Sequence, residues 1–535
     1  MYRVVVLVAV AAVLGGCAKP AQPATPSSGA PPSGNPTAEA LPPPLVPAMP
    51  LPDNAVDNAV AKLDGIADEL MKSSGIPGMA VAVVHGGKTV YAKGFGVKDV
   101  RNGDAPANKV DPDTVFQLAS LSKPLGSTVV AHQVGIGAIS WDTPIVEKLP
   151  WFELKDPVVT NMVTVGDMYS HRSGLPDHAG DLLEDLGYDR RYVLEHLRQL
   201  PLDPYRISYA YTNFGLTAGA EAVATSAGKS WEDLSQEVLY GPLGMTSTSS
   251  QFSDYEARTD KAVGHIHVDD AYKPLFVRDA QAESPAGGVS SSVNDMTKWL
   301  TMVLADGSFN GQRIVDPKAL LPAVTPQITS DRASEPAMRS GFYGYGFNIS
   351  TTAAARQQLS HSGAFELGAG TNFVAIPSAD VAIVALTNAT PSGIPETLTA
   401  EFADLVQFGE VRQDWRGLYG AAFKQMEGPE GSLAGQQPPA NPAPAPATAA
   451  LVGTYENSYW GPATVADSNG KLTLAIGPRE KLDLTHWDGN VFTFVPTGEN
   501  APPGSISKAT FAGGNLTLEY YDTEKMGTFT RAPGR

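Results

Sequence analysis

The sequence predicts an α+β domain followed by a small all-β domain. Strand-like runs stand near both ends of a long segment, at 79–96 and 371–388, with helical periodicity and Gly/Pro-rich loops between them. We expect these runs to join one sheet that lies beside a helical region. After residue 450 the pattern changes to short alternating runs separated by turn residues, which is typical of a small barrel.

The composition sets broad limits on function. The chain has 535 residues, of which 42% are hydrophobic, so it is long enough for more than one domain and for a large core. Its formal net charge is −18. A nucleic-acid partner is therefore not expected, because a phosphate backbone requires a basic face.

The first residues have the pattern of a bacterial lipoprotein signal. Arg3 gives a positive start, and the apolar run at 4–14 is too short for a comfortable membrane span. The sequence Leu-Gly-Gly-Cys that ends at Cys17 resembles a lipobox. We expect a signal peptide at 1–16 and lipidation of Cys17, which would anchor an extracytoplasmic protein to a membrane on its periplasmic or cell-surface side. An ordinary signal peptide that contains a cysteine is the alternative.

Two Pro/Ala-rich stretches divide the rest of the chain. Residues 17–52 and 428–450 cannot bury enough apolar surface to fold, and their prolines keep them extended. We expect a disordered tether and a linker, respectively. The folded domains are then 53–427 and 451–535. Because Cys17 is the only cysteine, neither an intramolecular disulfide nor a cysteine metal site is possible.

The first elements of the larger domain follow from apolar spacing. Apolar residues recur at helical spacing over 53–72, which predicts one helix. The runs at 79–85 and 88–96 predict two strands, and the Gly86-Gly87 pair between them is typical of a β-hairpin. Near the end of the domain, two more strands are predicted at 371–377 and 381–388.

The tail contains short alternating runs at 471–476, 491–495, 515–521 and 527–532. Turn pairs separate them: Asn469-Gly470, Asp488-Gly489 and Gly513-Gly514. The pattern predicts a small barrel. We expect Trp460 and Trp487 to belong to its core rather than to contact a ligand.

A candidate nucleophile lies in the stretch FQLASLSKPLG. Ser120 precedes Lys123 by three residues, so on a helix the two side chains would share a face. A serine hydroxyl needs a neighbouring base to become a strong nucleophile, and lysine can serve when burial or nearby cations lower its pKa. Pro124 is tolerated only in a first helical turn, so we expect a helix to begin near Ser120. Taken alone, the spacing is a weak signal, and a helix cap followed by a surface lysine explains it better than a catalytic pair does.

Two further motifs follow in chain order, Tyr211-Thr212-Asn213 and His361-Ser362-Gly363. A Ser-x-x-Lys, a Tyr-x-Asn and a basic residue-x-Gly in this order resemble the serine β-lactamase and penicillin-binding family. More specifically, the chain resembles the class C β-lactamase-like serine hydrolases, which include DD-carboxypeptidases, D-aminopeptidases and esterases. The stretches at 75–99, 167–178 and 285–300 resemble the same family.

The resemblance implies a fold and a set of roles. The fold would be a β-lactamase/transpeptidase-like domain, an antiparallel sheet with helices on its faces plus a helical subdomain. Ser120 would form the acyl-enzyme, and Lys123 and Tyr211 would share the proton transfers, with the identity of the base left open. Asn213 would orient Lys123 and the substrate amide. The tail resembles the lipocalin-like domain found after some of these hydrolases.

The resemblance also implies roles for three residues of the strand expected beside the serine. The backbone N–H groups of Ser120 and Ala364 would form the oxyanion hole, and Gly363 would let substrate lie close to the strand. His361 stands where the lactamases carry a lysine. A histidine changes charge near pH 6.5, so we expect binding of carboxylate-bearing substrates to weaken as the pH rises through that titration. The alternative is that burial keeps His361 neutral throughout and leaves it only as a hydrogen-bond donor. This departure weakens the case for penicillin hydrolysis.

The predicted function is a serine hydrolase of amide or ester bonds, a peptidase, carboxypeptidase or esterase, with a small-molecule or peptide substrate such as a cell-wall peptide. A true β-lactamase is one alternative. The other is a catalytically weak or non-catalytic penicillin-binding or recognition lipoprotein that keeps the fold and uses the β domain for recognition. No cofactor or metal is expected: the stretch GHIHVDD only superficially resembles a zinc motif. The sequence leaves the oligomeric state and the role of the tail open.

Overall fold

The computed structural model describes residues 42–426 and 428–533. The predicted signal peptide, the lipidation site Cys17 and most of the predicted tether lie outside the described residues. Within the described part of the chain, no helix combines the length and apolar character needed to cross a membrane.

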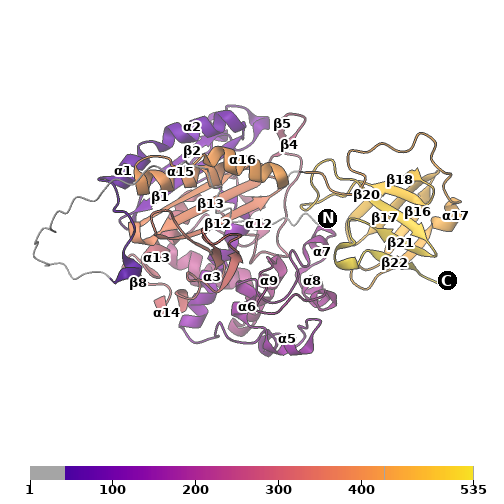
Figure 1. Cartoon of the computed structure of the whole chain (residues 1–535), viewed down its shortest axis with the longest axis horizontal. Helices are drawn as coiled ribbons and strands as arrows, with labels where there is room; N and C mark the ends of the chain where they lie inside the picture. Colours follow the sequence, from indigo (N-terminus) through magenta and orange to yellow (C-terminus); the bar gives the residue numbers. More distant parts are fainter. Residues whose placement is uncertain (1–41, 427, 534–535) are drawn as a thin grey trace, which may run out of the picture.

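One antiparallel sheet of eight strands forms the centre of the larger domain (Figure 1). The first two strands, β1 (Gly78–His85) and β2 (Lys88–Gly96), form the predicted hairpin. Strand β1 pairs with β14 (Val381–Thr387), so the two ends of the domain meet in the sheet as expected. In spatial order the sheet continues with β13 (Ala369–Ile376), β12 (Gln357–Phe365), β11 (Asn348–Thr351), β10 (Gly341–Tyr343) and β9 (Ile328–Asp331).

Helices cover both faces of this sheet. On one face lie α1 (Ala55–Val60), α2 (Leu63–Ser74), α15 (Ile394–Phe408) and α16 (Trp415–Met426), uppermost in Figure 1. The other face packs against α13 (Val293–Leu304) and the helical region, whose apolar side chains form one continuous core with the sheet. The predicted helix over 53–72 is wrong in one respect, because a turn at 61–62 divides it into α1 and α2.

The helical region contains α3 (Ser122–Gly135), α4 (Ile145–Lys148), α5 (Pro157–Met162), α6 (Val165–Tyr169), α7 (Asp181–Asp185), α8 (Arg190–His196), α9 (Asn213–Ala227), α10 (Trp231–Ser235), α11 (Gly241–Leu243), α12 (Phe252–Ala257) and α14 (Pro317–Leu320). Three two-stranded ribbons accompany them: β3 (Phe116–Gln117) with β6 (Ser290–Ser291), β4 (Ile266–Val268) with β5 (Ala271–Lys273), and β7 (Ser308–Phe309) with β8 (Gln312–Arg313).

The tail folds into a closed eight-stranded barrel beside α7 and α8 (Figure 1). After α17 (Thr448–Leu451), its strands are β15 (Gly453–Glu456), β16 (Ala463–Ser468), β17 (Lys471–Ile476), β18 (Glu480–Asp488), β19 (Val491–Phe494), β20 (Ser507–Ala512), β21 (Asn515–Leu518) and β22 (Thr528–Arg531). Alternate side chains fill the interior, which is how a small barrel obtains its core. Each strand pairs with the next, and β22 closes on β15.

The two tail tryptophans have different environments. Trp460 is buried, as the sequence predicts. Trp487 is half-exposed, so the expectation that it belongs to the core is wrong. The pairing of β18 with β19 shifts register between His486 and Asp488, which leaves Trp487 as the extra residue of a β-bulge. A bulge interrupts the alternation of inward and outward side chains, so the pattern could not place this ring correctly.

Candidate active site

Ser120 lies in a single 3₁₀ turn, Ala119–Leu121, between β3 and α3. The α-helix begins two residues after the serine, close to the predicted position. Ala119 is fully buried and has a φ of 47°, a left-handed conformation that is costly for a residue with a side chain. The Ser122 hydroxyl donates to the Ala119 carbonyl at 2.6 Å and so helps to hold this turn. The nucleophile candidate is therefore presented by a sharply bent backbone at the start of a buried helix.

Lys123 is completely buried, and its amine points at the serine. Its Nζ atom lies 3.0 Å from Ser120 Oγ, 2.7 Å from Asn213 Oδ1 and 3.0 Å from the Ala286 carbonyl oxygen. Burial lowers the pKa of Lys123 to about 8, although the carboxylates of Glu283 and Asp181 act in the opposite direction. With two acceptors bound to two of its N–H groups, the neutral amine would direct its lone pair at the serine hydroxyl.

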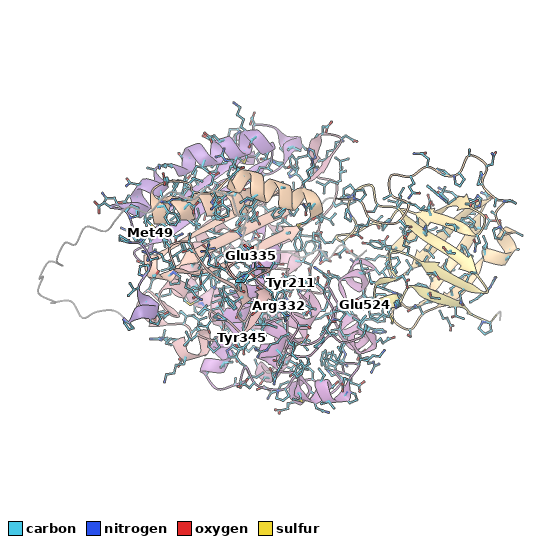
Figure 2. The ribbon with its side chains drawn as sticks, in the orientation of Figure 1. Met49, Tyr211, Arg332, Glu335, Tyr345 and Glu524 are labelled. Atoms are coloured by element: carbon cyan, nitrogen blue, oxygen red, sulfur yellow. The ribbon has the colours of Figure 1, made fainter. Side chains whose placement is uncertain are left out.

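Tyr211 approaches the same hydroxyl from another segment. It lies in the interior, between the sheet and the helical region (Figure 2), and its phenol donates to Ser120 Oγ at 2.8 Å. Burial raises the pKa of Tyr211 well above its ordinary value. The ring also faces Lys123, whose Nζ is 4.5 Å from the ring centroid. Ser120 thus has hydrogen bonds to both of the groups predicted to move its proton.

The loop that follows α6 holds the Tyr-x-Asn motif in place. Asp177 accepts the Tyr211 N–H at 2.7 Å, and the His171 Nδ1 atom accepts the Thr212 N–H at 3.2 Å. His171 therefore braces the site by hydrogen bonds. Asn213 is the first residue of α9, and it donates to the Asp181 carboxylate at 3.0 Å while accepting from Lys123.

His361 reaches the site on β12, but the expected titration of this residue is wrong. Its Nδ1 atom lies 2.6 Å from the Ser362 carbonyl oxygen, so Nδ1 carries the proton, and Nε2 accepts from the Tyr343 hydroxyl at 2.9 Å. Burial, together with the charge of Lys123, lowers the pKa of His361 to about 3. The ring is then neutral from pH 5 to 9 and both of its nitrogens are already engaged.

Gly363 lies where β12 crosses the serine turn. A Cβ atom at this position would stand 2.3 Å from the Leu118 carbonyl oxygen, 2.3 Å from Thr371 Oγ1 and 3.0 Å from the Ser120 nitrogen. The glycine is thus required for the close packing of β12 on the turn. This packing brings the strand that carries Ala364 next to the Ser120 backbone N–H, the two groups predicted to form an oxyanion hole.

Comparison with known proteins identifies the larger domain. Residues 63–407, more than half of the chain, match the family model described as Beta-lactamase. The chain belongs to the beta-lactamase family. Residues 437–517 match a second model, described as a domain of unknown function (DUF3471).

Similar proteins in this family include hydrolases and penicillin-binding proteins. The chain is 29% identical over 414 residues to the unguisins hydrolase ungD' of Aspergillus campestris (strain IBT 28561), covering 72% of this chain and 73% of that protein. It is 24% identical over 262 residues to the D-alanyl-D-alanine-carboxypeptidase/endopeptidase AmpH of Escherichia coli (strain K12), covering 48% and 64%, respectively. These relationships support a serine hydrolase of the beta-lactamase-related type.

Solved structures share the fold at lower sequence identity. The octameric penicillin-binding protein homologue from Pyrococcus abyssi superimposes with a TM-score of 0.56 at 18% identity, covering 86% of this chain and 98% of that one. A class C beta-lactamase from Rhodobacter sphaeroides superimposes with a TM-score of 0.52 at 23% identity, covering 65% and 98%. The predicted antiparallel sheet with an attached helical region is therefore confirmed.

Several groups at this beta-lactamase-family site, one of them a backbone carbonyl, were not singled out from the sequence. The Ala286 carbonyl binds Lys123, Asp181 binds Asn213, and Tyr343 binds His361. Ala286 lies within 285–300, a stretch that resembles the family, so a signal for it existed. Asp181 and Tyr343 lie outside the quoted motifs, and their roles depend on tertiary contacts that no local pattern encodes.

Proposed function

We propose that this serine hydrolase cleaves amide bonds of a small peptide substrate through an acyl-enzyme on Ser120. The observation that carries the proposal is the position of Ser120 Oγ, 3.0 Å from Lys123 Nζ and 2.8 Å from the Tyr211 hydroxyl. A serine with two proton-transfer groups in hydrogen-bond range is the arrangement that nucleophilic catalysis requires. The similarity to hydrolases of peptide substrates supports the same class.

The proton transfers follow from the pKa shifts. Neutral Lys123 accepts the Ser120 proton while Oγ forms its bond to the acyl carbon, because its pKa is lowered to about 8. Tyr211 keeps its proton at this stage, because burial raises its pKa. The phenol can then donate toward the leaving nitrogen as the C–N bond breaks, and Lys123 can resupply the proton. A water molecule releases the acyl group by the reverse path.

The neutral state of His361 bears on substrate choice. In this proposal the site holds no permanent cation on β12 to pair with a substrate carboxylate, since His361 is buried with its pKa at about 3. We therefore propose that the cleaved bond lies within a peptide or beside an uncharged group, rather than next to a free C-terminal carboxylate. An ester of similar shape would react by the same steps.

The test is a panel of three acyl donors with wild type and Ser120→Ala. The panel contains an N-acylated peptide amide or p-nitrophenyl ester, a D-alanyl-D-alanine peptide and a fluorescent penicillin. We expect turnover of the first, slower reaction of the two carboxylate-bearing donors, and loss of all turnover in Ser120→Ala. Preferential hydrolysis of penicillin would favour a true β-lactamase, and stable penicillin labelling without turnover would favour a penicillin-binding protein.

We further propose that the protein is an extracytoplasmic lipoprotein anchored through Cys17. The support is the sequence alone: the positive start, the short apolar run and the lipobox-like ending at Cys17. Two or more acyl chains would be needed for stable attachment. The Pro/Ala-rich stretch that follows would hold the hydrolase away from the bilayer.

A further inference from the structure

The loop between β19 and β20 of the barrel contacts two segments that flank the active site. We call α7 the helical wall and the end of β12 the sheet wall. On the helical wall, Asp185 at the end of α7 accepts the backbone N–H groups of Glu499 and Asn500 at 3.0 Å each, and the Asn500 side chain at 2.9 Å. On the sheet wall, the Glu499 carboxylate accepts the N–H groups of Glu366 at 2.6 Å and Leu367 at 3.3 Å. One residue pair of the barrel thus bridges the two walls.

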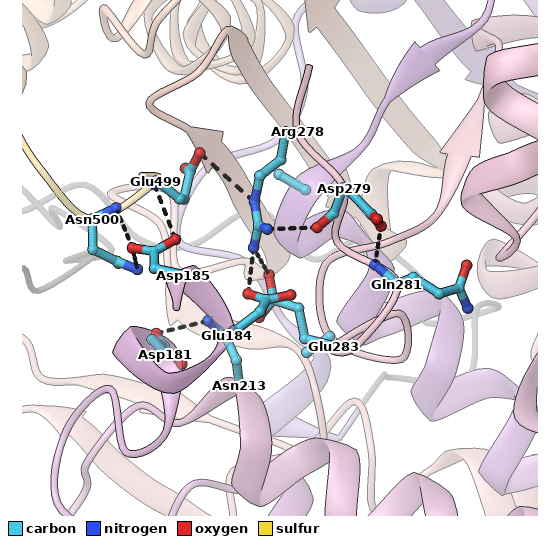
Figure 3. A network of polar contacts seen from close by, with 12 residues as sticks. Asp181, Glu184, Asp185, Asn213, Arg278, Asp279, Gln281, Glu283, Glu499 and Asn500 are labelled. Atoms are coloured by element: carbon cyan, nitrogen blue, oxygen red, sulfur yellow. Dashed lines mark hydrogen bonds and ion pairs between the residues drawn. The ribbon is translucent and has the colours of Figure 1, made fainter. Parts of the chain in front are cut away.

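A buried ion cluster lies at this junction (Figure 3). The Arg278 guanidinium donates to Glu184 at 2.6 Å and to Glu283 at 2.8 Å, and its Nε lies 3.7 Å from the Glu499 carboxylate. The side chains of Arg278 and Glu499 are only 8% and 11% exposed. One cation therefore faces three carboxyl groups that are largely buried from solvent, and one of these groups belongs to the barrel. Such a cluster requires well-fixed geometry to be stable.

The cluster is connected to Lys123 by two short paths. The Glu283 carbonyl accepts the Ala286 N–H at 2.7 Å, and the Ala286 carbonyl in turn accepts from Lys123 at 3.0 Å. On the other path, Asp181 at the start of α7 binds Asn213, which accepts from Lys123 at 2.7 Å. Helix α7 is five residues long, and its first residue faces the catalytic side while its last residue holds the barrel loop.

A third connection runs along β12. Glu366 and Leu367 directly follow this strand, which ends at Phe365 and carries Ala364 and Gly363 beside the serine turn. When Glu499 accepts their N–H groups, it fixes the end of the strand against the Arg278 cluster. The barrel loop is therefore connected to the two acceptors of Lys123 through Arg278 and α7, and to the strand next to Ser120 through the residues that follow β12.

We propose that the barrel domain contributes to catalysis by holding the segments around the active site in place, and that Glu499 is the positioning residue for acylation of Ser120. This inference rests on the proposed function. Glu499 does not meet the reacting atoms: it acts by holding β12, α7 and the Glu283–Ala286 turn in one fixed arrangement. A displacement of about 1 Å in such groups is enough to cost on the order of 100-fold in rate, because proton transfer and acyl transfer depend steeply on distance.

The test compares Glu499→Ala, Glu499→Gln and Glu456→Gln in the full-length protein. Glu456 is an exposed barrel residue on β15 and is the matched control. With a p-nitrophenyl ester in single-turnover mode, we expect Glu499→Ala to lower the acylation rate constant by roughly 10- to 100-fold, with little change in the concentration for half-maximal rate. Glu499→Gln retains one acceptor oxygen and should recover part of the rate. The control should match wild type.

Amide hydrogen exchange supplies the structural readout. Glu499→Ala should increase exchange in peptides that contain Glu366 and Leu367, whereas Glu456→Gln should not. The inference is overturned if hydrogen exchange at Glu366 and Leu367 increases in Glu499→Ala while the acylation rate constant stays at the wild-type value. It is also overturned if only the affinity for substrate changes. If the alanine variant does not fold, Glu499→Gln and Asp185→Asn carry the same comparison. Ser120→Ala separates the two proposals, because residual turnover in that variant would reject the proposed function itself.

Discussion

At the scale of single residues, the proposed reaction depends on a lysine that is neutral when it accepts the serine proton. Lysine in water titrates near 10.4, and burial lowers the pKa of Lys123 to about 8. The neutral amine has a lone pair for the Ser120 proton, whereas the ammonium form has only donors. The catalytic base therefore becomes available as the pH rises through this value.

This predicts a pH profile with a defined direction. For an uncharged ester, kcat/KM should rise between about pH 7 and 9 and then level off, as Lys123, whose pKa is about 8, loses its proton. The lower part of the rise also reflects Glu283, because burial raises the pKa of this carboxyl to about 7 and its charge acts on Lys123. His361 should contribute no step, because its pKa of about 3 lies below this range. The measurement is initial-rate kinetics from pH 5 to 10. A step near pH 6.5 that disappears in His361→Gln would contradict the neutral, engaged histidine.

A second prediction at this scale separates the catalytic hydroxyl from an ordinary buried one. Lys123→Ala and Tyr211→Phe should each lower kcat/KM by about 10²–10⁴-fold, because each removes a proton-transfer group. Tyr240→Phe is the matched control: this buried phenol bonds to Ser250 at 2.9 Å. The control should lose roughly 1 kcal/mol of stability and no activity. Equal kinetic effects of the two tyrosine substitutions would argue against a role for Tyr211.

At the scale of elements, the sequence correctly predicted the features that depend on residues close together in the chain, such as the first hairpin. Gly86 and Gly87 both adopt positive φ, of 62° and 72°, which is why this pair marked the hairpin correctly. The apolar spacing did not indicate the break between α1 and α2 or the bulge at Trp487, and the contact of Asp181 with Asn213 joins segments 32 residues apart. The spacing of Ser120 and Lys123 indicated their proximity, but only the fold brings Asn213 and Ala286 to the same amine.

The crossing of β12 over the serine turn yields a third prediction. Gly363→Ala should destabilise the protein by roughly 1–3 kcal/mol, since its Cβ would overlap the Leu118 carbonyl, and it should also reduce acylation. Gly65→Ala in α2 is the control, because nothing lies within 4 Å of a Cβ there, and alanine should stabilise the helix slightly. Thermal unfolding and acylation rates check both variants. A Gly363→Ala protein with wild-type values of each would show that the strand does not need this close approach.

At the scale of the whole molecule, the proposed anchor and tether precede the hydrolase domain and the barrel along the chain. The anchor predicts that the mature protein begins at Cys17 and partitions into detergent. Cys17→Ser should leave the protein unprocessed or release it from the membrane fraction. Phase partitioning and mass spectrometry of the mature N-terminus check this outcome. A soluble mature chain that begins at another residue would reject the anchor and leave the hydrolase account unchanged.

The central claim is that Ser120 carries the acyl group during turnover. Its most direct test is mass spectrometry of the protein quenched during hydrolysis of a p-nitrophenyl ester, followed by peptide mapping. We predict a mass increase equal to the acyl group on the peptide that contains Ser120, absent in Ser120→Ala and accumulating more slowly in Lys123→Ala. An acyl group on a different residue, or undiminished turnover by Ser120→Ala, would contradict the account.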